Sequence, residues 1–433
     1  MTTVAEVRLW GRSIGAVSLA DAAQFAQFEF DPAFARSGIE VAPLTMPLSG
    51  RIYSFPELAP RTYAGLPGLL ADSLPDRFGN ALIDAWLATQ GRTPESFNAV
   101  ERLCYIGERG MGALEFVPAT GPARVASQVQ IDKLVVLASQ VLTQRAGVQG
   151  SLADGREAEA LTDILRVGTS AGGARAKAVI AWNPATNEVR SGQLPADTGF
   201  EYWLLKFDGV RGNKDKELED PQGYGAIEFA YSQMAREAGI DINECRLFEE
   251  NGRRHFMTRR FDRLAGGQKL HMQSLCALAH YDYNLAGAYA YEQALLVIRR
   301  LGLPMSTVEQ QFRRMAFNIV GRNQDDHVKN IAFLMDKSGQ WSLSPAFDLT
   351  YAYNPAGQWT GSHQMTMNGK RDDFTLEDFR ACARSAAMKR GRAERILEEV
   401  TASVTRWPQF AEAAAVPEQT AQSIQRVLRL QIV

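Results

Sequence analysis

The sequence predicts an α+β protein in which a mixed α/β half precedes an α-rich half. Strand-like and helix-like periodicities alternate up to about residue 260, and the pattern from Leu270 onward is almost wholly helical. The 433 residues are enough for two or three domains. A hydrophobic content of 45% with 22% charged residues is typical of a folded protein rather than a disordered one.

Charge and cysteine content exclude several classes of protein. Lysine plus arginine number 47 against 49 aspartates plus glutamates, a net charge of -2, so any site for a polyanion must be local. No stretch of 18 apolar residues and no export signal is present, so we expect a cytoplasmic protein without a membrane span. The cysteines lie far apart without a CxxC pair, which predicts free thiols and argues against structural zinc: Cys104, Cys245, Cys276 and Cys382.

The first 120 residues are predicted to form a small sheet followed by a helix. Short β-type runs cover residues 7–10 and 15–19, and Gly11 separates them. Residues 65–91 change to helical spacing, with Gly91 as a plausible terminator. Residues 104–118 resemble a hairpin around a glycine-rich turn. We place the first domain at residues 1–120.

The remaining chain divides near residue 261. Residues 121–261 contain a helical stretch, strands at 177–182 and 202–207, a helix at 227–238 and a strand at 255–260. Residues 262–433 are predicted to be helical. The expected helices share a 3.6-residue periodicity and cover residues 272–278, 289–301, 308–320 and 376–404.

The sharpest chemical signal is GRNQDDHVKNIAFLM, residues 321–335. Asp325 and Asn330 have the spacing of the aspartate and asparagine in the catalytic loop of protein kinases. Asp348 follows 18 residues after Asn330, behind an apolar strand-like segment, as the magnesium-binding aspartate of kinases does. Each loop alone is also compatible with a solvated turn or a helix cap. Both loops in this order favour a magnesium site, because carboxylates are hard oxygen ligands.

Two further features are consistent with a nucleotide site. The cluster at Ser170, Ala171, Gly172 and Gly173 precedes a β-like run, and its backbone N–H groups could cradle phosphates, although such clusters are more often turns. Lys206 interrupts the apolar strand EYWLLKF, so it either extends its amine to solvent or points into a cleft. Glu228, on the next helix, would pair with it as in kinases.

The stretch HFMTRRFDR, residues 255–263, ends where the α/β half gives way to the helical half. In a two-lobed nucleotide enzyme this is the position of a hinge that offers backbone groups to adenine. The arginines of this region could instead form an exposed edge or a surface for an acidic partner: Arg253, Arg254, Arg259, Arg260 and Arg263.

Together these stretches resemble the HipA family of bacterial serine/threonine protein kinases, the toxin half of HipBA toxin–antitoxin modules. The resemblance covers nearly the whole chain. Its motifs are GLPGLLADSLPDRFGN (65–80), TSAGGARAK (169–177), LLKF (204–207), RRFDR (259–263), NQDDHVKN (323–330) and SPAFDL (344–349). It implies a two-lobed protein-kinase-like fold: an α/β N-lobe with an extra N-terminal subdomain, and an all-α C-lobe.

The resemblance also implies roles for individual residues, with ATP and Mg²⁺ as cofactors. Asp325 corresponds to the catalytic base, Asn330 and Asp348 to the magnesium ligands, and Lys206 to the lysine on the ATP phosphates. Arg259 and Phe261 match the hinge positions that meet adenine. Ser170 matches the serine that such kinases autophosphorylate, which resembles an off switch because a phosphate of about -1.5 to -2 charge cannot share a cradle with ATP phosphates. We expect Asp326, His327 and Lys329 to support the loop, His327 through packing or hydrogen bonds.

The implied partners are a HipB-like helix-turn-helix antitoxin, through which DNA would mainly be contacted, and a protein substrate such as an aminoacyl-tRNA synthetase. Residues 270–280, LHMQSLCALAH, replace an acidic run found in better known members, which leaves the substrate open. Two alternatives stay open. One is a corepressor with little turnover, and the other is a kinase for a small molecule or lipid, because the loop lacks HRD.

Overall fold

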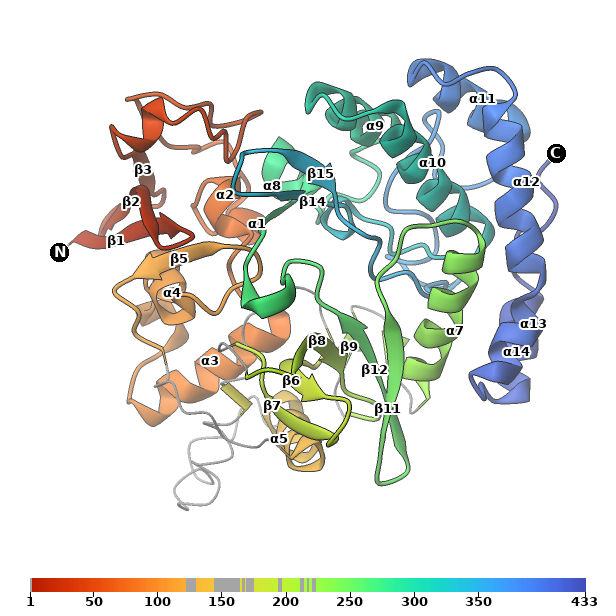
Figure 1. The fold of residues 1–433 in the computed structure, drawn as a ribbon, viewed down its shortest axis with the longest axis horizontal. Helices are drawn as coiled ribbons and strands as arrows, with labels where there is room; N and C mark the ends of the chain where they lie inside the picture. Colours follow the sequence, from red (N-terminus) through yellow and green to blue (C-terminus); the bar gives the residue numbers. More distant parts are fainter. Residues whose placement is uncertain are drawn as a thin grey trace.

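The computed structural model describes residues 2–121, 130–143, 164–165, 168, 175–193, 197–210, 214–215, 218–219 and 223–433. Figure 1 shows the N-terminal strands (red) on one side of the molecule and the C-terminal helices (blue) on the other, with the green and teal elements between them. Every helix in the described part of the chain is too short or too polar to span a lipid bilayer.

Residues 2–121, here called the N-terminal unit, carry an antiparallel sheet in the order β4-β3-β2-β1-β5. Its strands are β1 (Thr2–Leu9), β2 (Arg12–Ala20), β3 (Gln27–Phe30), β4 (Ile52–Tyr53) and β5 (Leu114–Val117). Trp10 and Gly11 both have positive φ, +50° and +79°, as a two-residue hairpin turn between β1 and β2 requires. The predicted strands at 7–10 and 15–19 are therefore confirmed.

Two predictions in the N-terminal unit are wrong. Cys104 lies in helix α4 (Ala99–Ile106) rather than in a hairpin, because Asn98 and Glu101 form a capping box that starts a helix. The stretch 65–91 is two helices, α2 (Gly68–Ala71) and α3 (Arg77–Thr89), because Pro75 interrupts the chain and the Asp76 side chain caps α3. The remaining short helices share this unit: η1 (Phe34–Arg36), α1 (Pro60–Tyr63) and η2 (Pro94–Ser96).

The central sheet runs in the order β11-β12-β8-β6-β7, and all its neighbouring strands are antiparallel. Its strands are β6 (Lys177–Asn183), β7 (Glu188–Ser191), β8 (Glu201–Lys206), β11 (Cys245–Glu250) and β12 (Arg253–Arg259). The same part of the chain contains helices α5 (Ile131–Thr143) and α7 (Tyr224–Glu237). Strands β9 (Lys214–Asp215) and β10 (Leu218–Glu219) form a separate two-stranded antiparallel sheet. The strands and the helix predicted over residues 177–260 are confirmed.

The helical half, which was predicted to be all-α, also contains a small antiparallel sheet, β13-β14-β15. Met272 was predicted to start a helix, but it lies in β13 (His271–Ser274), because this segment pairs with β14 (Ala332–Met335). The helix begins only after Ser274, whose side chain caps α8 (Leu275–Ala279). The predicted helix at 376–404 is split at Gly391, whose φ is +81°. The other elements are η3 (Ala265–Gly267), α9 (Tyr291–Arg300), α10 (Met305–Val320), η4 (Val328–Asn330), β15 (Trp341–Leu343), α11 (Leu376–Ser385), α12 (Arg392–Thr405), α13 (Trp407–Ala413) and α14 (Glu418–Gln425).

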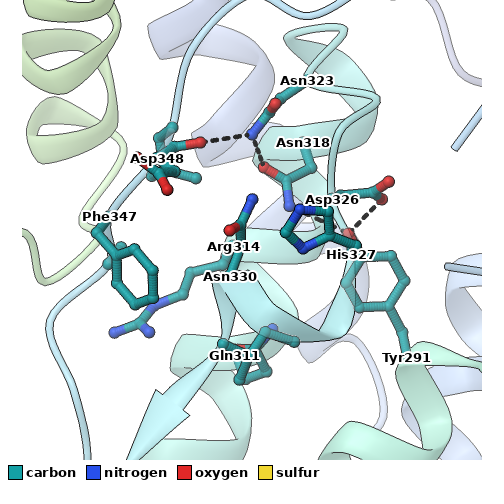
Figure 2. A pocket seen from close by; sticks show the side chains of 13 residues that line it. Tyr291, Gln311, Arg314, Asn318, Asn323, Asp326, His327, Asn330, Phe347 and Asp348 are labelled. Atoms are coloured by element: carbon teal, nitrogen blue, oxygen red, sulfur yellow. Dashed lines mark hydrogen bonds between the residues drawn. The ribbon is translucent and has the colours of Figure 1, made fainter. Parts of the chain in front are cut away.

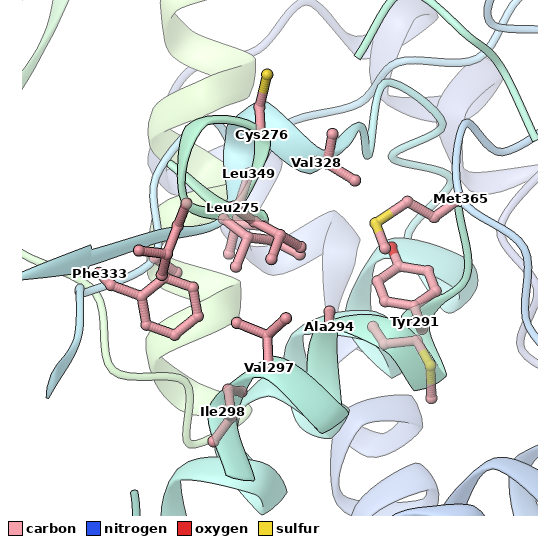
Figure 3. Packing of buried hydrophobic residues seen from close by; sticks show 14 of the residues in the cluster. Leu275, Cys276, Tyr291, Ala294, Val297, Ile298, Val328, Phe333, Leu349 and Met365 are labelled. Atoms are coloured by element: carbon pink, nitrogen blue, oxygen red, sulfur yellow. The ribbon is translucent and has the colours of Figure 1, made fainter. Parts of the chain in front are cut away.

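The hydrophobic core joins these parts rather than separating them. One cluster of buried side chains runs from the N-terminal sheet through α8, α9 and α10, and a second joins α3 and α5 to the central sheet. Figure 3 shows Val328 packing with Leu275, Tyr291 and Met365. Because Val328 is 2% exposed, it anchors the loop that carries Asp325 and Asn330.

Candidate active site

A cleft of about 870 Å³ lies where the N-terminal unit, the central sheet and the helical half meet. It brings together most of the predicted site residues: Lys206, Glu228, Arg259, Phe261, Asp325, His327, Lys329, Asn330 and Asp348. Basic side chains outnumber acidic ones among the lining residues, although the whole chain carries a net charge of -2. The charge of the lining is therefore compatible with an anionic ligand, and the volume of the cleft is large enough for a nucleotide.

Lys206 is the centre of a buried ion-pair cluster. It ends β8, and its Nζ lies 2.5 Å from Glu228 Oε1 on α7 and 2.5 Å from Asp348 Oδ1. Burial opposes the lysine charge, but the carboxylates of Asp348 and Glu228 raise the pKa of Lys206 above its ordinary value. The predicted pairing of a strand lysine with a helix glutamate is thus present in the structure.

Asp348 is held ionised and in an unusual backbone conformation. Burial favours its neutral form, but Lys206 and then Lys177 outweigh burial and lower the pKa of Asp348 to about 2. Its φ is +53°, a left-handed conformation that costs a non-glycine residue about 1 kcal/mol. Asn323 Nδ2 donates a hydrogen bond to its carbonyl at 3.3 Å (Figure 2). The Asp348 side chain is 30% exposed, so its carboxylate is accessible from the cleft.

The loop from Asp325 to Asn330 presents its first and last side chains to the cleft. Trp359 Nε1 donates to Asp325 Oδ1 at 2.6 Å, and Asn330 Nδ2 donates to the Asp325 carbonyl at 2.9 Å. In Figure 2 the Asn330 amide and the Asp348 carboxylate flank the same space. Trp359 lies outside every motif that the sequence singled out, because its contact depends on a fold that returns the chain 34 residues later.

Asp326 faces away from the cleft and fixes the loop 325–330 to the protein core through hydrogen bonds. The carboxylate is completely buried and accepts hydrogen bonds from the Tyr291 hydroxyl (2.5 Å), the Gln364 N–H (2.7 Å) and His363 Nδ1 (2.8 Å). Burial favours the neutral acid, but His363 and the hydrogen bonds lower the pKa of Asp326 below its ordinary value. We infer that the two adjacent aspartates have different tasks, one toward the cleft and one toward the core.

His327 and Lys329 both lie against Tyr283. The ring centroids of His327 and Tyr283 are 5.5 Å apart, and Lys329 Nζ lies 5.1 Å from the tyrosine ring centroid. Burial opposes the lysine charge, but Asp72 raises the pKa of Lys329. These contacts support the expectation that both residues brace the loop.

The predicted hinge residues have different environments. The main-chain N–H of Arg259 donates to the Glu244 carbonyl (2.9 Å), and the Arg259 carbonyl accepts from Asn243 Nδ2 (2.8 Å). The Phe261 ring lies beside Phe347, with centroids 5.6 Å apart, and both residues line the cleft. The Phe261 ring therefore lies at the cleft, whereas the main-chain N–H and carbonyl of Arg259 are already hydrogen-bonded within the protein.

The basic cluster is mostly internal rather than an exposed edge. Arg260 and Arg263 both bond to the buried carboxylate of Asp262, and Gly112 of the N-terminal unit donates its N–H to the same carboxylate at 2.7 Å. Arg253 and Arg254 donate to main-chain carbonyls. The sequence did not reveal that this motif fastens the N-terminal unit to the rest of the molecule.

The predicted phosphate cradle at Ser170, Ala171, Gly172 and Gly173 lies outside the described residues. The chain is described again from Arg175, whose guanidinium carbon lies 3.5 Å from the Tyr224 ring centroid. Lys177 follows, and its Nζ lies 3.2 Å from Asp76 Oδ2 in the N-terminal unit. This ion pair was not predicted, because a separation of 101 residues hides it in the sequence.

The donor set at Asn330 and Asp348 fits magnesium. Mg²⁺ takes oxygen ligands and keeps several waters or phosphate oxygens, so one carboxylate and one amide oxygen suffice from the protein. In the described part of the chain no group of three or more His, Cys, Asp or Glu side chains could hold a metal by itself. The four cysteines are free and buried. The geometry thus suits a metal that arrives with a phosphate ligand.

The fold and the cleft define a kinase-like α+β protein, with a lysine, a glutamate, two aspartates and an asparagine converging between a sheet and a helical half. Residues 5–117 match the HipA N-terminal domain, and residues 169–407 match the HipA-like C-terminal domain. The chain therefore belongs to the HipA family.

Solved structures support the same fold. HipA of Shewanella oneidensis MR-1, solved as a toxin–antitoxin complex with HipB and its operator DNA, superposes with a TM-score of 0.67 at 15% identity, over 98% of this chain and 94% of that chain. The match confirms the predicted fold class. The Helicobacter pylori proinflammatory kinase CtkA matches 52% of this chain and 92% of its own at 12% identity, with a TM-score of only 0.31. No curated protein matches the chain.

Proposed function

We propose that this chain is an ATP- and Mg²⁺-dependent serine/threonine protein kinase and the toxin of a type II toxin–antitoxin module. The observation that carries the proposal is the convergence of Lys206, Asp348, Asn330 and Asp325 on one cleft. Spacing alone did not require these residues to meet, since Lys206 and Asp348 come from opposite halves of the chain.

The chain's own residues would divide the reaction as follows. Asn330 and Asp348 hold the metal, which when bound neutralises charge on the phosphates of ATP. Lys206 contacts the same phosphates and is held in place by Glu228. Asp325, oriented by Trp359, would accept a hydrogen bond from the attacking hydroxyl and take its proton, while the hydroxyl oxygen bonds to the γ-phosphorus and the bond from that phosphorus to the departing ADP breaks.

Regulation and partners follow from family membership and remain part of the proposal. Phosphorylation of Ser170 would place a charge of about -1.5 to -2 on the predicted phosphate loop, where it would compete with the ATP phosphates and therefore switch the enzyme off. A HipB-like antitoxin would supply DNA contacts, as HipB accompanies HipA in the Shewanella complex. An aminoacyl-tRNA synthetase is the class of substrate that we propose.

Incubation of the purified chain with Mg²⁺ and γ-labelled ATP tests this function. We expect label on the chain itself, mapped to Ser170 by mass spectrometry, no label when EDTA replaces Mg²⁺, and no label at this site in Ser170→Ala. Absence of any transfer to the chain, to HipB-bound complexes or to lysate proteins would leave a corepressor as the better account. Transfer only to small molecules or lipids would contradict a protein kinase.

A further inference from the structure

A chain of four polar side chains leads from the protein surface to the loop 325–330. Asp372, whose side chain is 38% exposed, forms an ion pair with Arg429. Arg429 Nη1 lies 3.3 Å from His363 Nε2, and His363 Nδ1 lies 2.8 Å from Asp326 Oδ2. The His363 and Asp326 side chains are completely buried. The loop that carries Asp325 is therefore connected to side chains that follow it much later in the sequence.

The bonding partners fix the protonation of His363. A guanidinium group only donates hydrogen bonds, so the contact with Arg429 requires His363 Nε2 to accept. Both oxygens of Asp326 also receive hydrogen bonds from other donors, the Gln364 N–H and the Tyr291 hydroxyl, so Asp326 is an ionised acceptor. The proton between Asp326 and the ring therefore lies on Nδ1, and His363 is neutral.

His363 belongs to a segment that contacts both aspartates of the loop. At the start of this segment, Trp359 Nε1 donates to Asp325 Oδ1 at 2.6 Å. At its end, the Gln364 N–H donates to Asp326 Oδ1 at 2.7 Å. The Gln364 side chain also donates to the Trp359 carbonyl, which joins the two ends of the segment. A shift of His363 would thus reach Asp325 through Trp359 as well as through Asp326.

The main chain around Arg429 is attached where the loop begins. The Arg429 N–H donates to the carbonyl of Val320, the last residue of α10, at 3.0 Å. Arg322 Nε donates to the Val427 carbonyl at 2.7 Å. Arg429 therefore joins the start of the loop, through its main chain, to His363, through its side chain.

We propose that His363 and Arg429 are positioning residues of this kinase, which hold the loop in the geometry that lets Asp325 serve the attacking hydroxyl. The inference rests on the proposed function, because it takes Asp325 as the group that accepts the proton. His363 acts through Asp326 and Trp359, and Arg429 acts through His363.

A purely structural role explains this arrangement less well. An imidazole buried between a carboxylate and a guanidinium requires the desolvation of both charges, and well-packed apolar side chains often stabilise such a site as well or better. A fully bonded polar network instead specifies one arrangement of its members. Such precision matters at this loop, since a misplacement of about 1 Å can reduce a reaction rate about 100-fold.

Single-turnover phosphotransfer and binding of a nonhydrolysable ATP analogue plus Mg²⁺, both measured on the full chain, test the proposal. Arg429→Met removes the guanidinium but keeps an unbranched side chain, so transfer should slow about 10- to 100-fold while affinity for the analogue stays within about twofold. Arg429→Lys should recover part of the rate, because it keeps a donor and a positive charge. Arg426→Met, at an exposed position of the same segment, is the matched control and should change neither quantity.

Two changes at His363 separate its two contacts. The amide of His363→Asn takes the place of Nδ1 and can still donate to Asp326, whereas the longer amide of His363→Gln reaches the place of Nε2 and faces Arg429. We expect His363→Asn to retain more transfer activity than His363→Gln, because the contact with Asp326 acts directly on the loop. Equal transfer rates in the two variants, with equally lowered melting temperatures, would show a structural role only and overturn the proposal.

NMR of the full chain with isotope-labelled histidine reads the protonation of His363 directly. The sequence has 5 histidines, so the His363 signal can be assigned by its loss in His363→Asn. The wild-type ring should carry its proton on Nδ1, and Arg429→Met should no longer hold the ring in this single form. A wild-type ring protonated on Nε2 would overturn the proposal.

The outcomes separate this inference from the proposed function. If the wild-type chain transfers no phosphate, the proposed kinase function fails. If it transfers phosphate and Arg429→Met does so at the wild-type rate, only the positioning role fails. An equal loss of transfer and of analogue affinity in Arg429→Met, with a lowered melting temperature, also overturns that role. Should Arg429→Met not fold, His363→Gln decides, and a wild-type transfer rate in that variant overturns the proposal.

Discussion

Residues 325–330 of the helical half and residues 72–76 of the N-terminal unit line one cleft, and both segments contain a pair of aspartates. In the first segment Asp325 faces the cleft with 20% of its side chain exposed. In the second, Asp72 accepts hydrogen bonds from the N–H and the hydroxyl of Ser274, and Asp76 caps α3. The first segment leaves one aspartate open to the cleft, whereas the second fastens one part of the molecule to another.

This difference shows that a short sequence motif can reveal candidate site residues but not the contacts that join distant parts of the chain. The polar residues of the loop 325–330 follow one another closely in the chain, so their spacing is visible in a single stretch of sequence. The polar groups of residues 72–76 are defined by partners about 100 to 200 residues away. Variants of Asp325 should therefore lose activity, whereas variants of the contact between Asp72 and Ser274 should lose stability.

The largest effect is expected from Asp348→Asn. Loss of the carboxylate removes a metal ligand and a partner of Lys206, so Mg²⁺-dependent phosphotransfer should fall by about 10³-fold. Urea unfolding should stay within about 1 kcal/mol of wild type, because Glu228 still pairs with the lysine. Glu398→Gln, on an exposed stretch of α12, is the control and should keep full activity. A wild-type rate of phosphotransfer in Asp348→Asn would contradict the assignment of Asp348 as a magnesium ligand.

A large effect on stability is expected from Asp326→Asn. The amide would direct an NH₂ group at donors that now bond a buried carboxylate, which should lower the free energy of unfolding by about 3 kcal/mol. Asp325→Asn should cost less than about 1 kcal/mol, because its carboxylate is partly exposed. Equal losses in the two neighbours, measured by urea unfolding, would contradict their division of tasks.

A smaller effect is expected from Ser274→Ala at the junction with the N-terminal unit. The change removes the cap of α8 and one hydrogen bond to Asp72, so it should cost about 1 to 2 kcal/mol in urea unfolding. Affinity for the ATP analogue should stay within about twofold in the folded fraction. A selective loss of nucleotide affinity without loss of stability would show that this junction belongs to the site.

A further effect concerns pH and the same junction. His280 Nε2 accepts the Gly68 N–H at 3.2 Å, and burial lowers the pKa of His280 to about 4. The unfolded chain, with a histidine pKa near 6.5, binds the proton first, so stability should fall as pH drops from about 6.5 toward 4 and then level off. Urea unfolding of His280→Asn at pH 7 and pH 5 should show a smaller decrease than wild type. An identical decrease would mean that other groups carry the pH dependence.

Local sequence singled out the residues of the cleft better than it singled out the contacts between distant parts of the chain. Asp325, Asn330 and Asp348 were found because a spacing of five residues and an apolar run before the second loop are local patterns. Lys206 was found because a charge interrupts an apolar strand. The pair of Lys177 with Asp76 was missed, because no local pattern distinguishes a lysine that faces a distant carboxylate.

The errors in the fold have related causes. The segment 104–118 combines a helix end with a strand that pairs with β1, and apolar periodicity over such short stretches does not separate the two. Met272 belongs to a strand only because β14 lies beside it. The sequence also gave no sign that Gly68 packs against α8. A Cβ at this position would lie 2.6 Å from His280 Cδ2 and clash with the Ala277 carbonyl, so only glycine fits.

The most direct test of the central claim separates binding from transfer in Asp325→Asn. If Asp325 serves the attacking hydroxyl and the metal rests on Asn330 and Asp348, this variant should bind Mg²⁺ and the ATP analogue within about twofold of wild type. Its single-turnover phosphotransfer rate should fall by about 10²- to 10⁴-fold. A variant that transfers phosphate at the wild-type rate would contradict the account.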